Sequence, residues 1–411
     1  MNACMIKSFG PNTLDRPVHE DLEHLSRKEW KVLDITLNAT NLFDNPEVCG
    51  IGHYVINLLV GMQEIDRLNH FRLVANPEAE KVFSHRFPDA CVIGVTYPTA
   101  LRHIRWKEGF FRHLYFERRS VPKIHKRGRS DLLFHPHIAQ SVYTSKSTKT
   151  VVMVHDLYLK HFPNELSKRY LAYLDATYRK TLQNADHIIT PSLFVKQDIL
   201  THYPKIPDHK ITPIHNPIVV RQTDISEVSI DKPYILSVNT IRFHKNLMTL
   251  IKAFEQIHGK IGHSLVLTGP VIPKEISQIQ TYINEKRIPR IVVTGYVTDA
   301  QRNYLYQNAS LFVSPSLHEG FGITPVEAAL FEIPVLTTRE TSIPEVTRNL
   351  LHYYEPATDH HQLALKIREV LGQDSDRMKL KEIREEFQNA YAASTIAQQY
   401  WDCFERVWER T

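Results

Sequence analysis

The stretch from Ser314 to Val346 constrains the fold more than any other part of the chain. Its residue pattern is that of a strand end, a glycine-containing turn, a short helix, a buried strand and the start of a second helix. Thr324, Pro325 and Glu327 match a helix start, with threonine at the N-cap, proline at the first helical position and glutamate at the third. We therefore predict that a helix begins at this point.

The amides at the start of that helix have no partner within the helix and carry the positive end of its dipole. We expect them to receive an anionic or hydroxyl-rich ligand from the preceding loop, where two glycines let the backbone approach a ligand closely. An alternative is that Glu327 is a capping carboxylate and nothing more, and that the first loop residue is a solvated charge. The loop consists of Glu319, Gly320, Phe321, Gly322 and Ile323.

With 411 residues the chain is longer than a single typical core, so two domains are expected. Strand patterns alternate with helix patterns on both sides of a polar segment, which predicts an α/β fold of two doubly wound, Rossmann-like domains with a crevice between them. The predicted division is a polar extension (1–30), a first domain (31–215), a hinge (216–232), a second domain (233–390) and a C-terminal helix (391–411) that crosses back.

Composition excludes several classes of protein. The 50 lysines and arginines against 45 acidic residues do not predict a nucleic-acid surface. The four cysteines lack the spacing of a zinc site or a disulfide framework. No apolar run approaches the roughly 18 residues of a membrane helix, and the first thirty residues are charged where a signal peptide is apolar. We expect a cytoplasmic protein.

Two segments are candidates to meet a phosphate. Gly50 and Gly52 form a GxG turn between a strand and a helix, but the third glycine of a dinucleotide fingerprint is missing. Lys245 falls just before a helical apolar pattern, at a strand-to-helix junction that faces the crevice. An ammonium group there can neutralise a diphosphate, although a surface lysine near a helix start is the plainer interpretation.

Histidines follow two predicted buried strands, where an open parallel sheet binds its ligands. His135 and His137 end the first strand, and His155 with Asp156 follows the second. A metal phosphohydrolase is one reading of these residues. We do not favour it, because no further histidine and aspartate constellation with ligand spacing accompanies them.

A basic and aromatic segment covers residues 102–127. An amphipathic helix of this kind can lie on an anionic membrane surface. The alternative is a solvated charged face whose aromatic stripe belongs to the core. The Asp374-Ser375-Asp376 triplet matches a DxD signature that binds a metal ion and a sugar nucleotide, but its position between two helices predicts a helix N-cap.

The segment HEGFGITPVE, with Glu319 and Glu327 eight positions apart, resembles the E-x7-E signature of the family-4 glycosyltransferases. Three more motifs precede this segment in the order seen in that family. They are a VHD strand ending at His155, an ADHIITPS strand and a lysine-asparagine pair at Lys245. The resemblance covers roughly residues 31–410. It implies the GT-B architecture and a nucleoside-diphosphate sugar as donor.

The resemblance also implies roles for individual residues. Glycines at positions 50 and 52 would face the donor diphosphate, His155 would lie near the sugar with Ser192 on the same side, and the glutamate at 327 would hold the ribose. The sequence differs from the family at two positions just before the lysine motif. Asn239 replaces the usual glycine, and Thr240 replaces the arginine of many members. Arg242 would then replace that arginine. A third departure is Glu332, where the family has glycine.

We therefore expect a retaining glycosyltransferase that moves a mannose-like or glucose-like hexose to a glycan or lipid-linked acceptor, in surface polysaccharide or lipopolysaccharide synthesis. The expected catalytic residues are His155, Lys245 and Glu319, and no metal or cofactor is expected. The protein would work in the cytoplasm, at the inner face of the membrane if the basic segment binds anionic lipid. A sugar-nucleotide epimerase and a non-catalytic scaffold stay open, while a Rossmann oxidoreductase would need the nicotinamide fingerprint that is missing.

Overall fold

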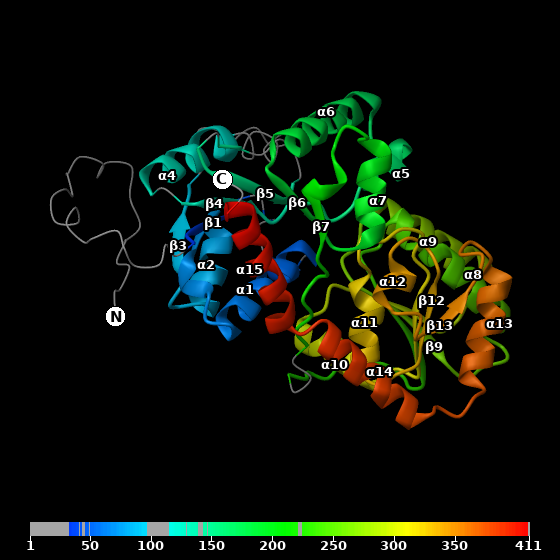
Figure 1. Cartoon of the computed structure of the whole chain (residues 1–411). Helices are drawn as coiled ribbons and strands as arrows, with labels where there is room; N and C mark the ends of the chain where they lie inside the picture. Colours follow the sequence, from blue (N-terminus) through cyan, green and yellow to red (C-terminus); the bar gives the residue numbers. More distant parts are fainter. Residues whose placement is uncertain are drawn as a thin grey trace.

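The computed structural model describes residues 33–40, 42, 46–48, 50–96, 115–128, 130–138, 143–145, 147–220 and 224–409. The predicted extension 1–30 and the first part of the basic segment, 102–114, lie outside the described residues. Figure 1 shows two α/β units side by side, each a parallel sheet with helices around it. The expected two doubly wound domains are confirmed.

The first sheet has seven parallel strands in the order β3-β2-β1-β4-β5-β6-β7. The strand order reverses direction between β1 and β4, where the crevice of a doubly wound sheet opens. The register places Ile35 of β1 opposite Phe71 of β2 and Leu132 of β4. The strands are β1 (Ile35–Ala39), β2 (Phe71–Ala75), β3 (Cys91–Gly94), β4 (Leu132–His135), β5 (Lys149–Met153), β6 (His187–Thr190) and β7 (Ile211–Pro213).

Helices cover both faces of this sheet. The larger ones are α1 (Gly50–Glu64), α2 (Pro77–Arg86), α4 (Val121–Arg127), α6 (Lys168–Asn184) and α7 (Leu193–His202). The shorter ones are η1 (Pro46–Val48), η2 (Leu68–His70), the π-helical η4 (Phe116–Ser120), α5 (Tyr158–His161), η5 (Pro163–Glu165) and η6 (Asp208–Lys210). None of the helices in the described part of the chain combines the length and the hydropathy that a membrane span needs.

The second sheet has six parallel strands in the order β10-β9-β8-β11-β12-β13. Its strands are β8 (Tyr234–Val238), β9 (Ser264–Thr268), β10 (Ile291–Gly295), β11 (Leu311–Ser314), β12 (Val335–Thr338) and β13 (His352–Tyr354). Its helices are η7 (Phe243–Lys245), α8 (Leu247–Ile257), α9 (Pro273–Lys286), α10 (Asp299–Asn308), α11 (Ile323–Leu330), α12 (Ile343–Val346), α13 (His360–Leu371) and α14 (Arg377–Ala390).

Two predicted helix starts need correction. The helix α11 begins at Ile323, and its N-cap is Gly322 in a left-handed conformation (φ 86°) with no side-chain cap. Glycine turns the chain there without steric penalty, so the predicted cap at Thr324 is wrong. The helix α1 begins at Gly50, so Gly52 lies inside it and is not part of a turn. A Cβ atom on Gly52 would lie 1.8 Å from the carbonyl oxygen of Pro46, which explains the glycine by packing.

The segment between the two sheets is tied to both domains. Asn57 of α1 donates a hydrogen bond from Nδ2 to the carbonyl oxygen of Pro217 (3.1 Å). The amide of Ile218 donates to the carbonyl of Tyr391 (3.0 Å), and the amide of Ser226 donates to Ala300. The hinge predicted at 216–232 therefore stays a prediction, and any hinge motion has to break contacts of this kind.

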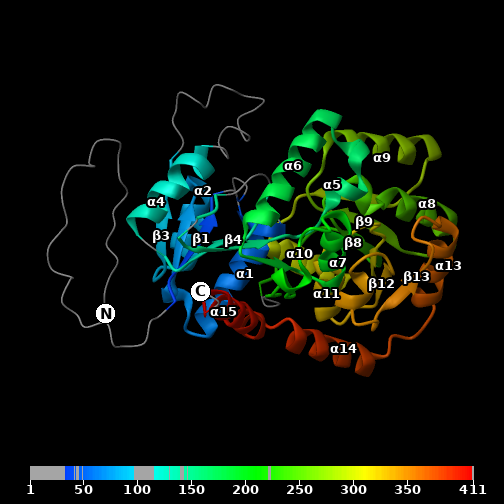
Figure 2. The ribbon, with the colours of Figure 1, turned by 45° about the horizontal axis from the view of Figure 1, so that its top comes forward.

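The helix α15 (Ala393–Glu409) crosses back onto the first domain, as Figure 2 shows. It packs along α1, where the hydroxyl groups of Tyr54 and Tyr400 are hydrogen bonded at 2.8 Å. The predicted apolar face of this helix is confirmed, because all five of its members are buried: Ile396, Tyr400, Cys403, Phe404 and Val407.

The two helices touch most closely at Gly61 of α1. A Cβ atom there would lie 2.1 Å from the carbonyl oxygen of Ala393 and 2.8 Å from the Cβ of Ala397. Alanine is the better helix former by about 1 kcal/mol. We nevertheless expect Gly61→Ala to destabilise the protein by about 1 to 3 kcal/mol, the usual effect of overpacking. Denaturant unfolding measures the change.

The matched control is Gly259→Ala, because a Cβ atom at Gly259 has no heavy atom within 4 Å. We expect this variant to unfold within about 0.5 kcal/mol of the parent. A Gly61→Ala protein as stable as the parent would show that α15 can move away from α1 at little expense.

Candidate active site

A cavity of about 210 Å³ lies between the two domains. The first domain contributes the N-terminal end of α1, and the second contributes the residues that follow the carboxyl ends of β8, β9 and β10. This is where an open parallel sheet binds ligands. Among the predicted site residues, those on its wall are Gly50, Lys245, Glu319, Ile323 and Glu327.

Lys245 and Glu319 form an ion pair on this wall, with Nζ 2.6 Å from Oε1. Burial raises the pKa of Glu319, but the ammonium of Lys245 outweighs that effect and holds the pKa below its usual value. Asn246 fixes the lysine backbone, because its side-chain amide donates to the carbonyls of Pro315 and Ala357. The ion pair therefore joins the loop after β8 to the loop after β11.

The loop that carries Glu319 is held by hydroxyl groups from the chain after β12. The amide of Glu319 donates to Oγ1 of Thr341 (3.0 Å), and that hydroxyl donates back to the Glu319 carbonyl. Ser342 donates from Oγ to the carbonyls of Glu319 and Phe321 (2.8 and 3.1 Å). The loop conformation is thus set before any ligand binds.

Glu327 lies on the same wall. Its carboxylate accepts a hydrogen bond from the hydroxyl of Tyr306 (3.2 Å) and lies 3.9 Å from Nη2 of Arg302. Arg302 also pairs with Asp299 at 3.1 Å. Burial, and then the Glu327 charge, raise the pKa of Tyr306, so this hydroxyl stays protonated and donates.

Arg302 is a wall residue that sequence reasoning missed. It lies on α10, which begins with a capping box formed by Thr298 and Gln301. That motif could have located the start of the helix and therefore the face on which Arg302 lies. No sequence pattern indicates that this face meets α11 and Glu327. Nε of Arg302 is buried and has no hydrogen-bond partner among the described residues.

Arg242 does not lie on this wall. It is exposed and lines a separate cavity of about 270 Å³ beside Phe243 and Glu165. The resemblance implied that Arg242 replaces the family's arginine at position 240, but Arg242 and Lys245, at the two ends of the short helix η7, line different cavities. Among the described residues that line the cavity between the domains, the arginine is Arg302, and the donor contact of Arg242 stays a prediction.

The glycine-rich loop packs between the two domains. A Cβ atom on Gly320 would lie 1.8 Å from the carbonyl oxygen of His155. Phe321 is buried in the second-domain core against His215 and Tyr391, so its side chain does not face a donor in the cavity. Its predicted contact can involve backbone atoms alone.

His155 is half-buried, and its Nε2 lies 2.9 Å from the carbonyl of Pro136. Burial lowers the pKa of the imidazole, which keeps it neutral near pH 7. Tyr54 contacts the ring edge-on at 4.9 Å. The predicted sugar contact of His155 stays a prediction, and this geometry leaves Nδ1 as the atom for a further hydrogen bond.

Contacts around α7 join the domains. Ser192, the N-cap of α7, donates from Oγ to the carbonyl of Gly320 (2.7 Å). Glu345 of the second domain accepts from the amides of Leu193 and Phe194 and from His215. Burial opposes ionisation of Glu345, but these hydrogen bonds outweigh it and lower its pKa. Ser192 thus has a structural role at the domain contact.

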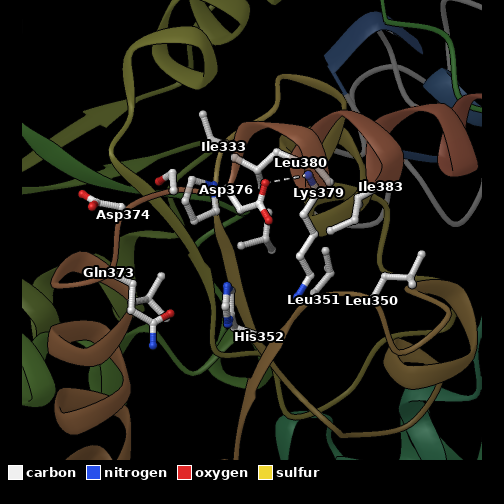
Figure 3. A pocket seen from close by; sticks show the side chains of 15 residues that line it. Ile333, Leu350, Leu351, His352, Gln373, Asp374, Asp376, Lys379, Leu380 and Ile383 are labelled. Atoms are coloured by element: carbon white, nitrogen blue, oxygen red, sulfur yellow. Dashed lines mark hydrogen bonds between the residues drawn. The ribbon is translucent and has the colours of Figure 1, made fainter.

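A further cavity of about 230 Å³ lies away from the crevice, between α14 and the end of β13. Figure 3 shows Asp374, Asp376, His352 and Lys379 around it. Asp376 is the N-cap of α14, and its carboxylate accepts a hydrogen bond from the amide of Lys379 (3.1 Å). The helix-cap interpretation of the DxD triplet is confirmed.

The histidines considered for a phosphohydrolase have other partners. Nε2 of His135 lies 2.8 Å from the carbonyl of Tyr143, and Asp156 accepts a hydrogen bond from the amide of Tyr158. Within the described ranges, the group of side chains close enough to share a metal ion is a different one. The hydrogen bonds of these residues are therefore structural.

The buried His244, next to Lys245, leads us to expect that the protein becomes less stable in acid. Burial, and then the Lys245 charge, lower its pKa to about 4. An unfolded chain binds this proton near pH 6.5, so the contribution of neutral His244 to stability is complete above pH 6.5 and is lost as the pH falls toward 4. We expect His244→Gln to remove about 3 kcal/mol of this decline in the free energy of unfolding, measured by denaturant titration across that range.

The exposed His209 supplies the control, since His209→Gln should leave the pH profile unchanged. Parallel profiles for the parent and His244→Gln would mean that other groups account for the acid sensitivity.

Comparisons with known proteins agree with this arrangement. Residues 48–222 match the model described as Glycosyltransferase Family 4, and residues 221–387 match Glycosyl transferases group 1. The serotype-specific mannosyltransferase WbdA of Escherichia coli is 29% identical over 220 residues, which are 48% of this chain and 26% of that protein. The O-antigen chain mannosyltransferase RfbU of Salmonella typhimurium is 26% identical over 58% of this chain and 66% of its own length.

Solved structures show the same fold at low identity. Sucrose-phosphate synthase from Thermosynechococcus elongatus superposes with a TM-score of 0.71 at 17% identity, over 92% of this chain and all of that chain. HepE from Anabaena, solved with UDP and glucose, gives a TM-score of 0.65 at 15% identity, over 91% of this chain and all of its own. The two family models follow each other along the two domains, and the chain belongs to glycosyltransferase family 4 with the GT-B architecture.

Proposed function

We propose that this chain is a retaining glycosyltransferase that moves a mannose-like or glucose-like hexose from a nucleoside-diphosphate sugar to a glycan or lipid-linked acceptor. The observation that carries the proposal is the Lys245–Glu319 ion pair of 2.6 Å on a cavity wall between two doubly wound domains. An ammonium and a carboxylate in this position can meet a diphosphate and a sugar together.

The donor would bind mainly to the second domain. Lys245 and Arg302 would neutralise the diphosphate, together with the amides at the start of α11. Glu327 would accept hydrogen bonds from the ribose hydroxyls, since its carboxylate is already oriented by Tyr306. We propose that Lys245, Arg302 and these amides meet the diphosphate without a metal ion.

The sugar would lie between Glu319 and His155. A neutral imidazole at His155 can hydrogen bond a sugar hydroxyl, and its burial makes it a poor general base. The acceptor would therefore attack from the face that the diphosphate leaves, and the leaving phosphate oxygen would take the acceptor proton. The charge that grows on the diphosphate would be stabilised by preoriented groups.

The relatives favour a role in surface polysaccharide synthesis. WbdA and RfbU are named as mannosyltransferases, and RfbU as an O-antigen chain enzyme. This chain spans about a quarter of WbdA and 66% of RfbU. HepE, of the same fold, was solved with UDP and glucose, which supports a nucleotide sugar as donor.

We also propose that the enzyme works in the cytoplasm and meets its acceptor at the inner face of the membrane. The described end of the basic segment has exposed Arg118, Arg119 and Lys123 and a buried Phe116. The carboxylate of Glu117 accepts a hydrogen bond from Asn38, which anchors this part to the domain. A basic face fixed in this way could attract anionic lipid.

The ribose role of Glu327 is tested by Glu327→Gln. The glutamine keeps the shape and can accept from Tyr306, but it lacks the charge that faces Arg302. We expect the dissociation constant for a nucleoside-diphosphate sugar to rise at least tenfold, about 1.4 kcal/mol, as measured by calorimetry.

A panel of donors in a thermal-shift assay identifies the sugar first, since a donor at a hundred times its dissociation constant stabilises the protein by about 2.7 kcal/mol.

Asp376→Ala is the control, because it removes the cap of α14 far from the cavity. It should lower stability by about 1 kcal/mol and leave donor affinity unchanged. Donor binding by Glu327→Gln at the parent affinity would refute the ribose role.

The stereochemical course tests the mechanism. We expect the product to keep the anomeric configuration of the donor, which the NMR coupling constant of the new linkage reports. His155→Ala should lower kcat by 100-fold or more and leave the shape of the pH profile unchanged, because the imidazole is not the base.

Inversion of configuration would refute the proposed attack and leave the fold assignment intact. A product released without any acceptor, as a rearranged sugar nucleotide, would favour an epimerase. Donor binding with no turnover for any acceptor would favour a non-catalytic scaffold.

A further inference from the structure

Three side chains that the proposed reaction does not use converge outside the cavity. His161 is the last residue of α5, and Asp198 and His202 lie one turn apart on α7. Figures 1 and 2 show these two helices next to each other. Nε2 of His161 lies 2.8 Å from Oδ2 of Asp198, and Nε2 of His202 lies 3.3 Å from Oδ1. One ligand atom from each residue lies within 4.8 Å of the others.

The distances suit a metal ion. Zinc binds imidazole nitrogen and carboxylate oxygen at about 2.0 to 2.2 Å, which puts tetrahedral ligand atoms about 3.4 Å apart. The imidazole nitrogens of His161 and His202 lie 2.8 and 3.3 Å from the two different carboxylate oxygens of Asp198, so side-chain rotations that bring one oxygen toward both nitrogens would complete the geometry. Because Asp198 and His202 are four residues apart on one helix, both face α5 without any change of the backbone.

The three side chains are buried on one side and open to solvent on the other, as expected of a site that an ion can enter. The Asp198 side chain is 6% exposed, while His161 and His202 are each 32% exposed. A carboxylate with so little water needs positive charge or strong donors around it. The open side of the two imidazoles leaves room for an ion to enter and keep a water ligand.

His318 covers the side of the three-residue cluster that faces the second domain. It is 4% exposed, its Nε2 has no hydrogen-bond partner among the described residues, and its ring centroid lies 4.4 Å from that of His161. The next residue is Glu319 of the proposed reaction site. The cluster of three ligands therefore packs against the loop that carries the active carboxylate, although it belongs to the first domain.

We propose that His161, Asp198 and His202 bind one divalent transition-metal ion of the zinc class, with water as the fourth ligand. Two imidazoles and one carboxylate favour such an ion over magnesium, which prefers oxygen ligands. On binding, a coordinating nitrogen must be free of its proton: a neutral imidazole carries that proton on Nδ1 instead, and a protonated imidazole releases one proton to solvent. The ion braces α5 against α7 beside the His318 ring. It is distinct from the diphosphate site and does not depend on the proposed reaction.

The test uses the full chain without an affinity tag, stripped with chelator and titrated with Zn²⁺ by calorimetry. We expect one ion per chain and a rise in melting temperature on binding. His202→Gln is the informative variant, because its amide can still donate to Asp198 and so preserves the contact. It should weaken the first equivalent of zinc at least tenfold, the lower limit seen even for groups outside the coordination sphere. Asp198→Asn should do the same.

The matched control is His85→Gln, an exposed histidine in the last turn of α2. It should bind zinc as the parent does. Co²⁺ provides a second readout, since a tetrahedral site gives strong visible absorption that His202→Gln should lose. Equal zinc affinity in the parent and His202→Gln, or loss of the first equivalent in His85→Gln, would overturn the proposal and leave the cluster an ordinary ion pair. Neither readout involves glycosyl transfer, so the outcome is separate from that of the proposed function.

Discussion

The contact of Gly320 with the first domain is the constraint on which the site depends. The carbonyl of His155 occupies the space that a side chain at Gly320 would need, and Ser192 donates to the Gly320 carbonyl from the same domain. The two domains thus meet at Gly320 through a close backbone contact and one side-chain hydrogen bond. Any residue larger than glycine would push the loop away and carry Glu319 with it. A glycine at this position therefore permits the close approach of the two domains.

Much of the fold could be predicted, because apolar periodicity reports burial directly. The strands around Val151 and Leu236 and the buried stripe from Ile396 to Val407 needed no tertiary information. The helix start at α11 was misplaced because two local signals compete. Thr324 offers a side-chain cap, but Gly322 can turn the chain earlier without strain, and the tertiary contacts of the loop favour the earlier turn.

The site residues also divide into those that a local sequence motif locates and those that depend on tertiary contacts. Lys245 and Glu327 belong to local motifs, and their positions on the cavity wall follow from the strand and helix ends that carry them. Arg242 and Arg302 could not be told apart in this way, since each is an arginine near a helix start. Which of them faces the cavity depends on how α10 packs against α11, where the contacting residues Tyr306 and Glu327 are 21 positions apart. The cluster around Asp198 was missed for the same reason, because α5 and α7 are separated by the whole of α6.

The return of α15 to the first domain has a consequence for how the protein is made. The face of α1 that receives it is apolar, and residues 65–392 leave the ribosome between the two helices. At roughly 5 to 20 residues per second, that face waits between about fifteen and sixty seconds for its partner. The domain synthesised first is therefore the one completed last. During translation a nascent chain of this protein therefore exposes this apolar helix surface until α15 has been synthesised.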